Sequence, residues 1–62
     1  MIRYIVELHP GVWLAPWKGD PGRTLVRETA RIFTSKRGAA IALAIARRHR
    51  PLPFAQVVEA NP

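Results

Sequence analysis

The side chains of this sequence that suit chemistry are cations and indole rings, and together they suit the binding of anions and flat rings. One group of cations brackets a run of small and aliphatic residues: Lys36, Arg37, Arg47 and Arg48. A second group combines rings with charge in a segment rich in proline and glycine: Trp13, Trp17, Lys18 and Arg23. Both groups are candidates for contact with a polyanion.

The first group lies on one face of an expected helix over residues 34–50. Thr34 or Ser35 can cap its N-terminus, and Pro51 ends it. From Lys36 to Arg48 such a helix extends about 18 Å, which is long enough to meet about two or three phosphates. The other explanation is structural, because cations such as Arg47 and Arg48 stabilise the carbonyl end of a helix. Both interpretations stay open.

The opposite face of this helix is apolar. Its centre is small, and larger aliphatic residues flank it, so we expect the helix to approach a sheet closely while its flanks clamp the strands. The centre consists of Gly38, Ala42 and Ala46, and the flanks of Ile41, Ile45 and Leu43. The uncharged run is far shorter than the ~20 residues that span a bilayer, so we expect no membrane span.

The two tryptophans have two interpretations. Beside Lys18 and Arg23 they can stack on bases or anchor a protein partner. Alternatively, one or both fill the end of a small core, where indole contributes much burial. We expect one of Trp13 and Trp17 to be buried and the other to be partly exposed.

Catalytic and metal-binding residues are scattered. The carboxylates, Glu7, Asp20, Glu28 and Glu59, fall in four different segments, and there is no cysteine. Ser35, the only serine, suits a helix cap better than a nucleophile. Neither His9 nor His49 has another potential ligand at metal-site spacing. We therefore expect no enzyme, no cofactor, no metal site and no small-molecule substrate.

Strands are expected on both sides of the helix. Residues 2–8 alternate in polarity, a His9-Pro10-Gly11 turn follows, and residues 12–15 resume as a strand. Because Pro-Gly favours a type II turn, we expect a bulge or a looser loop at this hairpin. We place a third strand at residues 30–33, although residues 24–33 also fit a helical face. After an extended connector, Pro51-Leu52-Pro53, the last strand covers residues 54–60.

This order, ββ(β)αβ, predicts a small α+β fold. We expect an antiparallel or mixed sheet of three to four strands, with one helix from the C-terminal half of the chain on one face. The other face is then exposed or is where a partner docks. The 62 residues are too few for more than a single small domain, 1–62.

Charge gives the broadest functional constraint. Ten Lys and Arg oppose four Asp and Glu, which gives a net charge of +6. Such a balance attracts nucleic acid, acidic proteins and anionic surfaces, although it also keeps a small protein soluble. With no secretory signal at the N-terminus, we expect a cytoplasmic protein.

The chain also resembles short uncharacterised proteins that bacterial phages and prophages encode. The resemblance extends over most of the chain and implies a bacterial or phage cytoplasmic protein with a binding role. It rests on Trp13, Pro16, Trp17, Gly19, Asp20, Pro21, Gly22, Arg23, Thr24, Phe33, Ala42 and Leu43.

Two functions follow as hypotheses. The first is nucleic-acid binding through the basic helix face and the loop: Lys36, Arg37, Arg47, Arg48, Lys18, Arg23 and Trp17. The alternative is a protein-interaction module, either a phage-type modulator or a homodimer. It would use the open sheet face, with Trp13 or Trp17 as the anchor.

Overall fold

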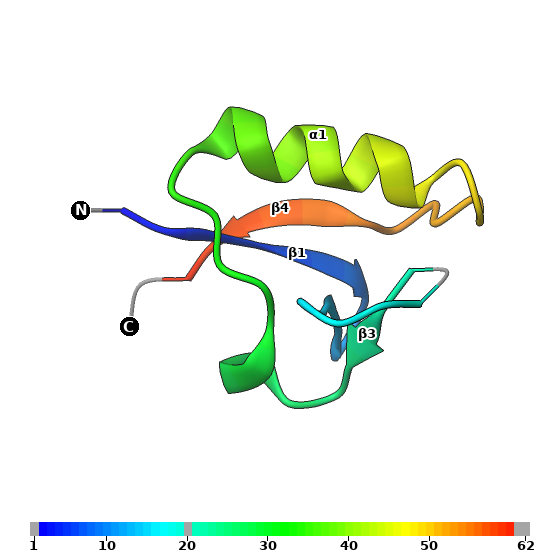
Figure 1. The fold of residues 1–62 in the computed structure, drawn as a ribbon, viewed down its shortest axis with the longest axis horizontal. Coiled ribbons are helices and arrows are strands. Elements are labelled where there is room, and N and C mark those ends of the chain that lie inside the picture. The colour runs from blue at the N-terminus through cyan, green and yellow to red at the C-terminus, as the bar shows by residue number, and fades with distance from the viewer. Residues whose placement is uncertain (1, 20, 61–62) are drawn as a thin grey trace.

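Four strands form one antiparallel sheet in the order β3-β2-β1-β4, and one helix packs on it (Figure 1). The computed structural model describes residues 2–19 and 21–60. The strands are β1 (Tyr4–His9), β2 (Val12–Leu14), β3 (Arg23–Thr24) and β4 (Gln56–Glu59). The helix is α1 (Lys36–Ala46), and a 3-10 turn, η1 (Arg27–Thr29), precedes it. The expected α+β fold is confirmed.

The β1–β2 hairpin turns at Pro10-Gly11, as expected. Gly11 has a φ of 80°, which glycine adopts without strain and which the third residue of a type II turn requires. The strand register shifts between Glu7 and His9, so β1 carries an extra residue there. The register shift confirms the expected bulge. The extra residue lets strands with the usual twist meet at a type II turn.

Helix α1 begins at a side-chain cap and ends in a tighter turn. The Ser35 Oγ accepts a hydrogen bond from the Gly38 N–H at 3.0 Å, so Ser35 rather than Thr34 is the cap. After Ala46 the helix tightens, because a backbone hydrogen bond there joins residues three positions apart instead of four: the His49 N–H donates to the Ala46 carbonyl at 3.1 Å. The helix is shorter than residues 34–50 because this tight turn leads the chain into Pro51.

The core lies between α1 and one face of the sheet. Val6 and Leu8 of β1 are fully buried there against Ala39 and Leu43 of α1. Alanine at these contacts lets the helix backbone approach the strands closely, but the buried face centres on Ala39, Leu43 and Ala46 rather than on Gly38, Ala42 and Ala46. The expectation that Ile41 and Ile45 clamp the strands is wrong, because both side chains are half exposed. The remaining buried members of this core are Leu14, Phe33, Ala46 and Leu52.

The second sheet face is partly covered, not open. Ile5 points away from α1 and is only 1% exposed. Figure 1 shows η1 on the side of the sheet opposite α1, where the chain crosses before it enters the helix. Trp13 pairs with Glu7 across the strands and is half-buried on the same side. The expectation that this face is exposed is thus wrong at Ile5, and η1 lies on this side of the sheet.

The third strand lies earlier in the chain than expected. It is Arg23–Thr24, which pairs with β2, whereas Phe33 makes only an isolated bridge with Tyr4. The chain between them turns because threonine hydroxyls replace ladder partners: the Thr24 Oγ1 accepts from the Val26 N–H at 3.0 Å. It also lies 2.7 Å from the Thr29 Oγ1. The hydroxyl groups of Thr24 and Thr29 thus fix a bend that the pattern of strand-forming residues in the sequence does not predict.

The connector to β4 is bent rather than extended. Leu52 has a φ of 46°, which non-glycine residues rarely adopt, and its side chain is buried in the core. The Ala55 N–H donates to the Leu52 carbonyl at 3.2 Å, which closes a turn before β4. Burial of the leucine side chain therefore offsets an unfavourable backbone conformation.

Candidate functional site

The β2–β3 loop is folded tightly on itself. Its neck is closed by a 2.9 Å hydrogen bond from the Ala15 N–H to the Gly22 carbonyl. Gly22 is needed there, because a Cβ atom at this position would collide with the Trp17 carbonyl oxygen. This packing of backbone on backbone leaves the side chains of Trp17 and Lys18 exposed. Asp20, which the sequence places in a turn of this loop, lies outside the described residues.

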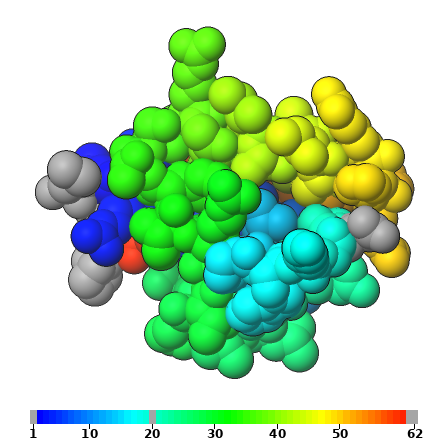
Figure 2. Space-filling view, viewed as in Figure 1, coloured from blue at the N-terminus to red at the C-terminus, as the bar shows by residue number. Residues whose placement is uncertain are grey.

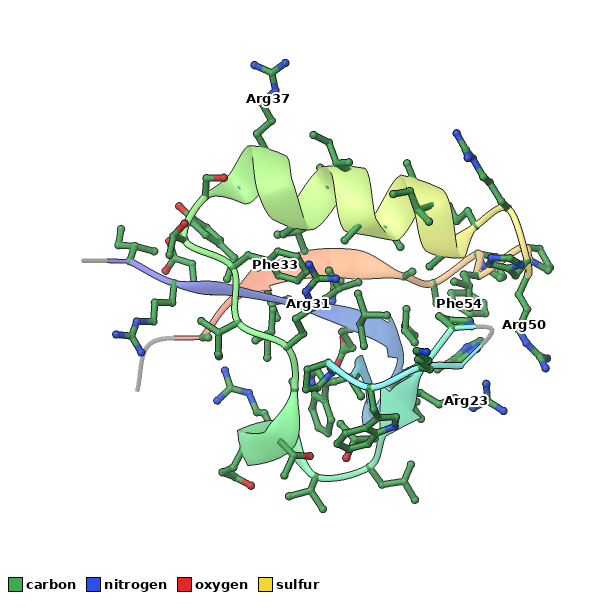
Figure 3. The ribbon with its side chains drawn as sticks, in the orientation of Figure 1. Arg23, Arg31, Phe33, Arg37, Arg50 and Phe54 are labelled. Carbon is green, nitrogen blue, oxygen red and sulfur yellow. The ribbon has the colours of Figure 1, made fainter. Side chains whose placement is uncertain are left out.

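Three cations meet at the end of the molecule where α1 ends. Lys18 and Arg23 of the loop segment and Arg50 after the helix line one hollow of about 390 Å³ together with Trp17. We call Lys18, Arg23 and Arg50 the cationic cluster. Figure 3 shows Arg23 and Arg50 at the same end of the molecule. The Arg23 Nη1 donates to the Pro21 carbonyl at 3.3 Å, so the loop itself helps to hold this guanidinium.

The cluster extends around Pro21 into a neighbouring hollow. Arg23 and Arg50 also line this second space, of about 370 Å³, together with His9 and Thr24. The two arginines therefore stand between two concave surfaces. An elongated anion that crosses this end of the molecule would meet both guanidinium groups, each of which offers several N–H donors.

An apolar groove lies beside the cluster. It separates α1 from the loop, has a volume of about 300 Å³, and is bounded by Ile41, Ile45 and Trp17. All three side chains are half exposed, at 52%, 50% and 52%. In Figure 2, α1 lies along the top of this face and the cyan loop below it. We call this feature the apolar groove.

One further cation lines the apolar groove. The Arg31 guanidinium carbon lies 4.8 Å from the centre of the Phe33 ring, a cation–π contact that Figure 3 shows between the helix and the loop. Lys18 and His49 line the same groove. The groove thus has an apolar floor and a basic rim.

The sequence-predicted site residues divide into two groups. Trp17, Lys18 and Arg23 come together in one hollow, as described above. The helix cations line none of the three cavities: Lys36 and Arg37 begin α1, and Arg47 and Arg48 follow its end. Figure 3 shows Arg37 pointing away from the molecule at the end opposite Arg50. The Arg47 Nη2 donates to the Ala55 carbonyl at 3.3 Å, which gives this side chain a structural contact.

The two tryptophans differ in exposure: one is partly exposed, as expected, but the other is half-buried and is not part of the core. Trp17 is the exposed one, and it lines both the apolar groove and the hollow of the cationic cluster. Trp13 is the more buried one, on β2. The sequence did not indicate which would be which, because both lie near prolines in the same short segment.

Sequence reasoning missed Arg50 and Arg31 as site residues. Arg50 was assigned to the helix end, and only the tight turn after Ala46 brings it to the loop. Arg31 sits in a segment expected to be a strand, and no local pattern indicates that it covers Phe33. For Arg50, the one available signal was the next residue, Pro51, because a proline fixes where the chain must leave the helix.

The described carboxylates lie outside all three cavities. Glu7 accepts a 3.0 Å hydrogen bond from the Gln56 amide on the second sheet face, Glu28 is in η1, and Glu59 is in β4. Across residues 2–19 and 21–60, no three His, Cys, Asp or Glu side chains gather as a metal site would require. In the same residues no helix is long and apolar enough to cross a membrane.

These features define a small α+β protein with a basic, partly apolar surface between its helix and its β2–β3 loop. Comparison with protein-family models, curated proteins and solved structures finds no match to the chain. The resemblance to phage and prophage proteins therefore stays a prediction, and function must be argued from the site itself.

Proposed function

We propose that the protein binds nucleic acid, and that the cationic cluster makes the main contact with the phosphates. The observation that carries this proposal is the shared hollow of Lys18, Arg23 and Arg50, with the exposed Trp17 at its border. Phosphates are the anions that clustered arginine and lysine bind with both charge and directed hydrogen bonds.

Charge beyond the cluster supports the same partner. The net charge of +6 attracts a polyanion over a long range, so it raises the rate of encounter before any specific contact forms. Acidic proteins would be attracted as well, but an exposed indole beside cations particularly suits nucleic acid, which offers flat bases and phosphates together. The cations at the two ends of α1 then act at a distance rather than as part of one continuous binding face.

The proposal includes no catalytic step. The side chains that line the three cavities are cations, histidines, a threonine and apolar groups, at least among the described residues. These are groups that bind and position rather than groups arranged as a nucleophile with a base. We further propose a bacterial or phage-encoded cytoplasmic protein, in line with the sequence resemblance.

The test is a pair of charge-matched triple variants. Lys18→Gln/Arg23→Gln/Arg50→Gln removes the cationic cluster, and Lys36→Gln/Arg37→Gln/Arg48→Gln removes the same charge elsewhere. Binding of a labelled DNA oligonucleotide is followed by fluorescence anisotropy at about 50 mM and about 200 mM salt.

We expect the cluster variant to bind at least about tenfold more weakly than the unaltered protein. The slope of log affinity against log salt should become less steep by about 2 to 3, because three phosphate contacts are lost. The control variant should change the slope much less. Equal losses in the two variants would show that charge acts diffusely, and absence of binding by the unaltered protein at low salt would overturn the proposal.

A further inference from the structure

Binding of phosphates by the cationic cluster does not explain the apolar groove. Ile41 and Ile45 are four residues apart on α1, so they form one strip along the helix. The buried face of α1 instead centres on Ala39, Leu43 and Ala46. Because the helix is rotated in this way, the two isoleucines do not clamp the strands but form one wall of the groove. Adjacent exposed apolar side chains of this kind are typical of a binding surface.

Trp17 joins the groove to the cationic cluster. It lines the apolar groove together with Ile41 and Ile45, and it lines the hollow of the cluster together with Arg23 and Arg50. An apolar space and a cationic space therefore share one residue, Trp17, whose side chain is half exposed. A nucleotide has the same two parts, a flat base and a charged phosphate.

The rim of the groove favours the same ligand. The Arg31 guanidinium carbon lies 4.8 Å from the centre of the Phe33 ring, and Lys18 lines the same groove. A guanidinium group held over an aromatic ring has a planar face of its own, on which a base can stack. A volume of about 300 Å³ is at the small end of ligand pockets, so it suits one or two bases rather than a folded domain.

We propose that the apolar groove takes the bases of a single-stranded nucleic acid while the cationic cluster takes its phosphates. This inference rests on the proposed function and narrows its substrate. The bases of a duplex are stacked on each other and paired, so their faces do not reach Trp17. Those of a single strand are free to turn outward and stack on an exposed indole.

The experiment compares an oligothymidine strand with a duplex of matched length at about 50 mM salt, where both bind by charge. The variants are Trp17→Ala, Trp17→Phe and Ile45→Thr. Phe54→Ala is the control, because Phe54 is an exposed aromatic, at 72%, that lines none of the cavities. Circular dichroism checks that each variant is folded.

We expect the single strand to bind at least about tenfold more tightly than the duplex. Trp17→Ala should weaken single-strand binding by about tenfold and leave duplex binding nearly unchanged, since stacking on an aromatic ring is lost only for the single strand. Trp17→Phe should restore most of this affinity, because a ring remains. Ile45→Thr should cause a smaller loss, and Phe54→Ala should cause none.

A spectroscopic measurement separates stacking from general weakening. In a Trp13→Phe background, Trp17 is the only tryptophan, so bound bases should quench its fluorescence in proportion to occupancy. Equal binding of both nucleic acids, with no effect of Trp17→Ala and no quenching, would overturn this inference while nucleic-acid binding stands. Absence of binding to either would overturn both, as would binding of an acidic peptide alone.

Discussion

Arg27 and Arg47 approach β4 from opposite layers of the molecule, and each donates a hydrogen bond to a main-chain carbonyl beside its outer edge. The Arg27 Nη2 lies 3.2 Å from the Glu59 carbonyl oxygen, and the Arg47 Nη2 lies 3.3 Å from that of Ala55. Since β4 pairs only with β1 in the described sheet, its other edge presents main-chain groups to solvent. The two guanidinium groups therefore occupy positions where a strand of another molecule would otherwise pair.

The first prediction is that Arg27→Ala/Arg47→Ala increases self-association. The double variant exposes two carbonyl groups on β4 and lowers the net positive charge, and both changes favour strand pairing between molecules. Sedimentation velocity across a concentration series measures the effect. Arg37→Ala/Arg48→Ala removes the same charge away from β4 and should stay monomeric at concentrations where the first variant associates. Equal self-association of the two variants would mean that net charge alone keeps molecules of the protein from associating.

The second prediction concerns the loop that carries Trp17. Gly22→Ala should destabilise the protein by about 1–3 kcal/mol, because the new Cβ atom collides with the Trp17 carbonyl oxygen. The displaced loop should also weaken binding of single-stranded DNA. Urea denaturation and anisotropy measure the two effects. Gly11→Asn is the control: this position has open space around it, and asparagine tolerates its positive φ, so little should change. A stable Gly22→Ala variant would show that the loop adapts without cost.

The third prediction is that Leu52→Ala destabilises the protein by about 2–4 kcal/mol. Leu52 is buried against the core, and alanine would leave a cavity while keeping the unfavourable backbone φ of 46°. Thermal and urea denaturation measure the loss. Leu25→Ala removes the same side chain from a site that is 76% exposed and should change stability by less than about 0.5 kcal/mol. Similar losses at both positions would contradict the packing described for the connector.

The fourth prediction separates two adjacent hydroxyl residues. Ser35→Ala should cost about 1 kcal/mol, because it leaves the Gly38 N–H without its side-chain acceptor at the helix start. Thr34→Ala should cost much less, since Thr34 precedes the cap and is exposed. Denaturant midpoints for the two variants check this difference. A larger loss of stability in Thr34→Ala than in Ser35→Ala would show that Ser35 is not the cap.

The parts of the fold that depend on near neighbours in the chain could be predicted from the sequence. The alternation of β1, the Pro10-Gly11 turn with a bulge or looser loop, and a hydroxyl cap at Thr34 or Ser35 each follow from a few adjacent residues. The α+β class followed from the order of these elements. For the same reason, the charged and aromatic character of the Trp17 loop was visible before its position was known.

What the sequence could not supply depends on contacts between distant segments. The side of α1 that faces the sheet is decided by the strands beneath it, so the exposure of Ile41 and Ile45 was not predictable. The third strand was misplaced because Thr24 and Thr29 bond to each other rather than continue a ladder. The meeting of Arg50 with Arg23 depends on both the helix end and the loop, which no single pattern reports.

The pairing of β1 with β4 has a consequence for how the chain is made. β1 lies inside the sheet, yet one of its two partners is the last strand, and the Ala60 N–H donates to the Arg3 carbonyl at 2.8 Å. A ribosome releases β1 well before it releases β4, so the sheet cannot be completed until β4 has been released. The nascent chain must therefore keep one edge of an apolar strand unpaired until β4 emerges, and closure over such a sequence distance slows folding. For a chain of this size, assembly is governed by topology more than by length.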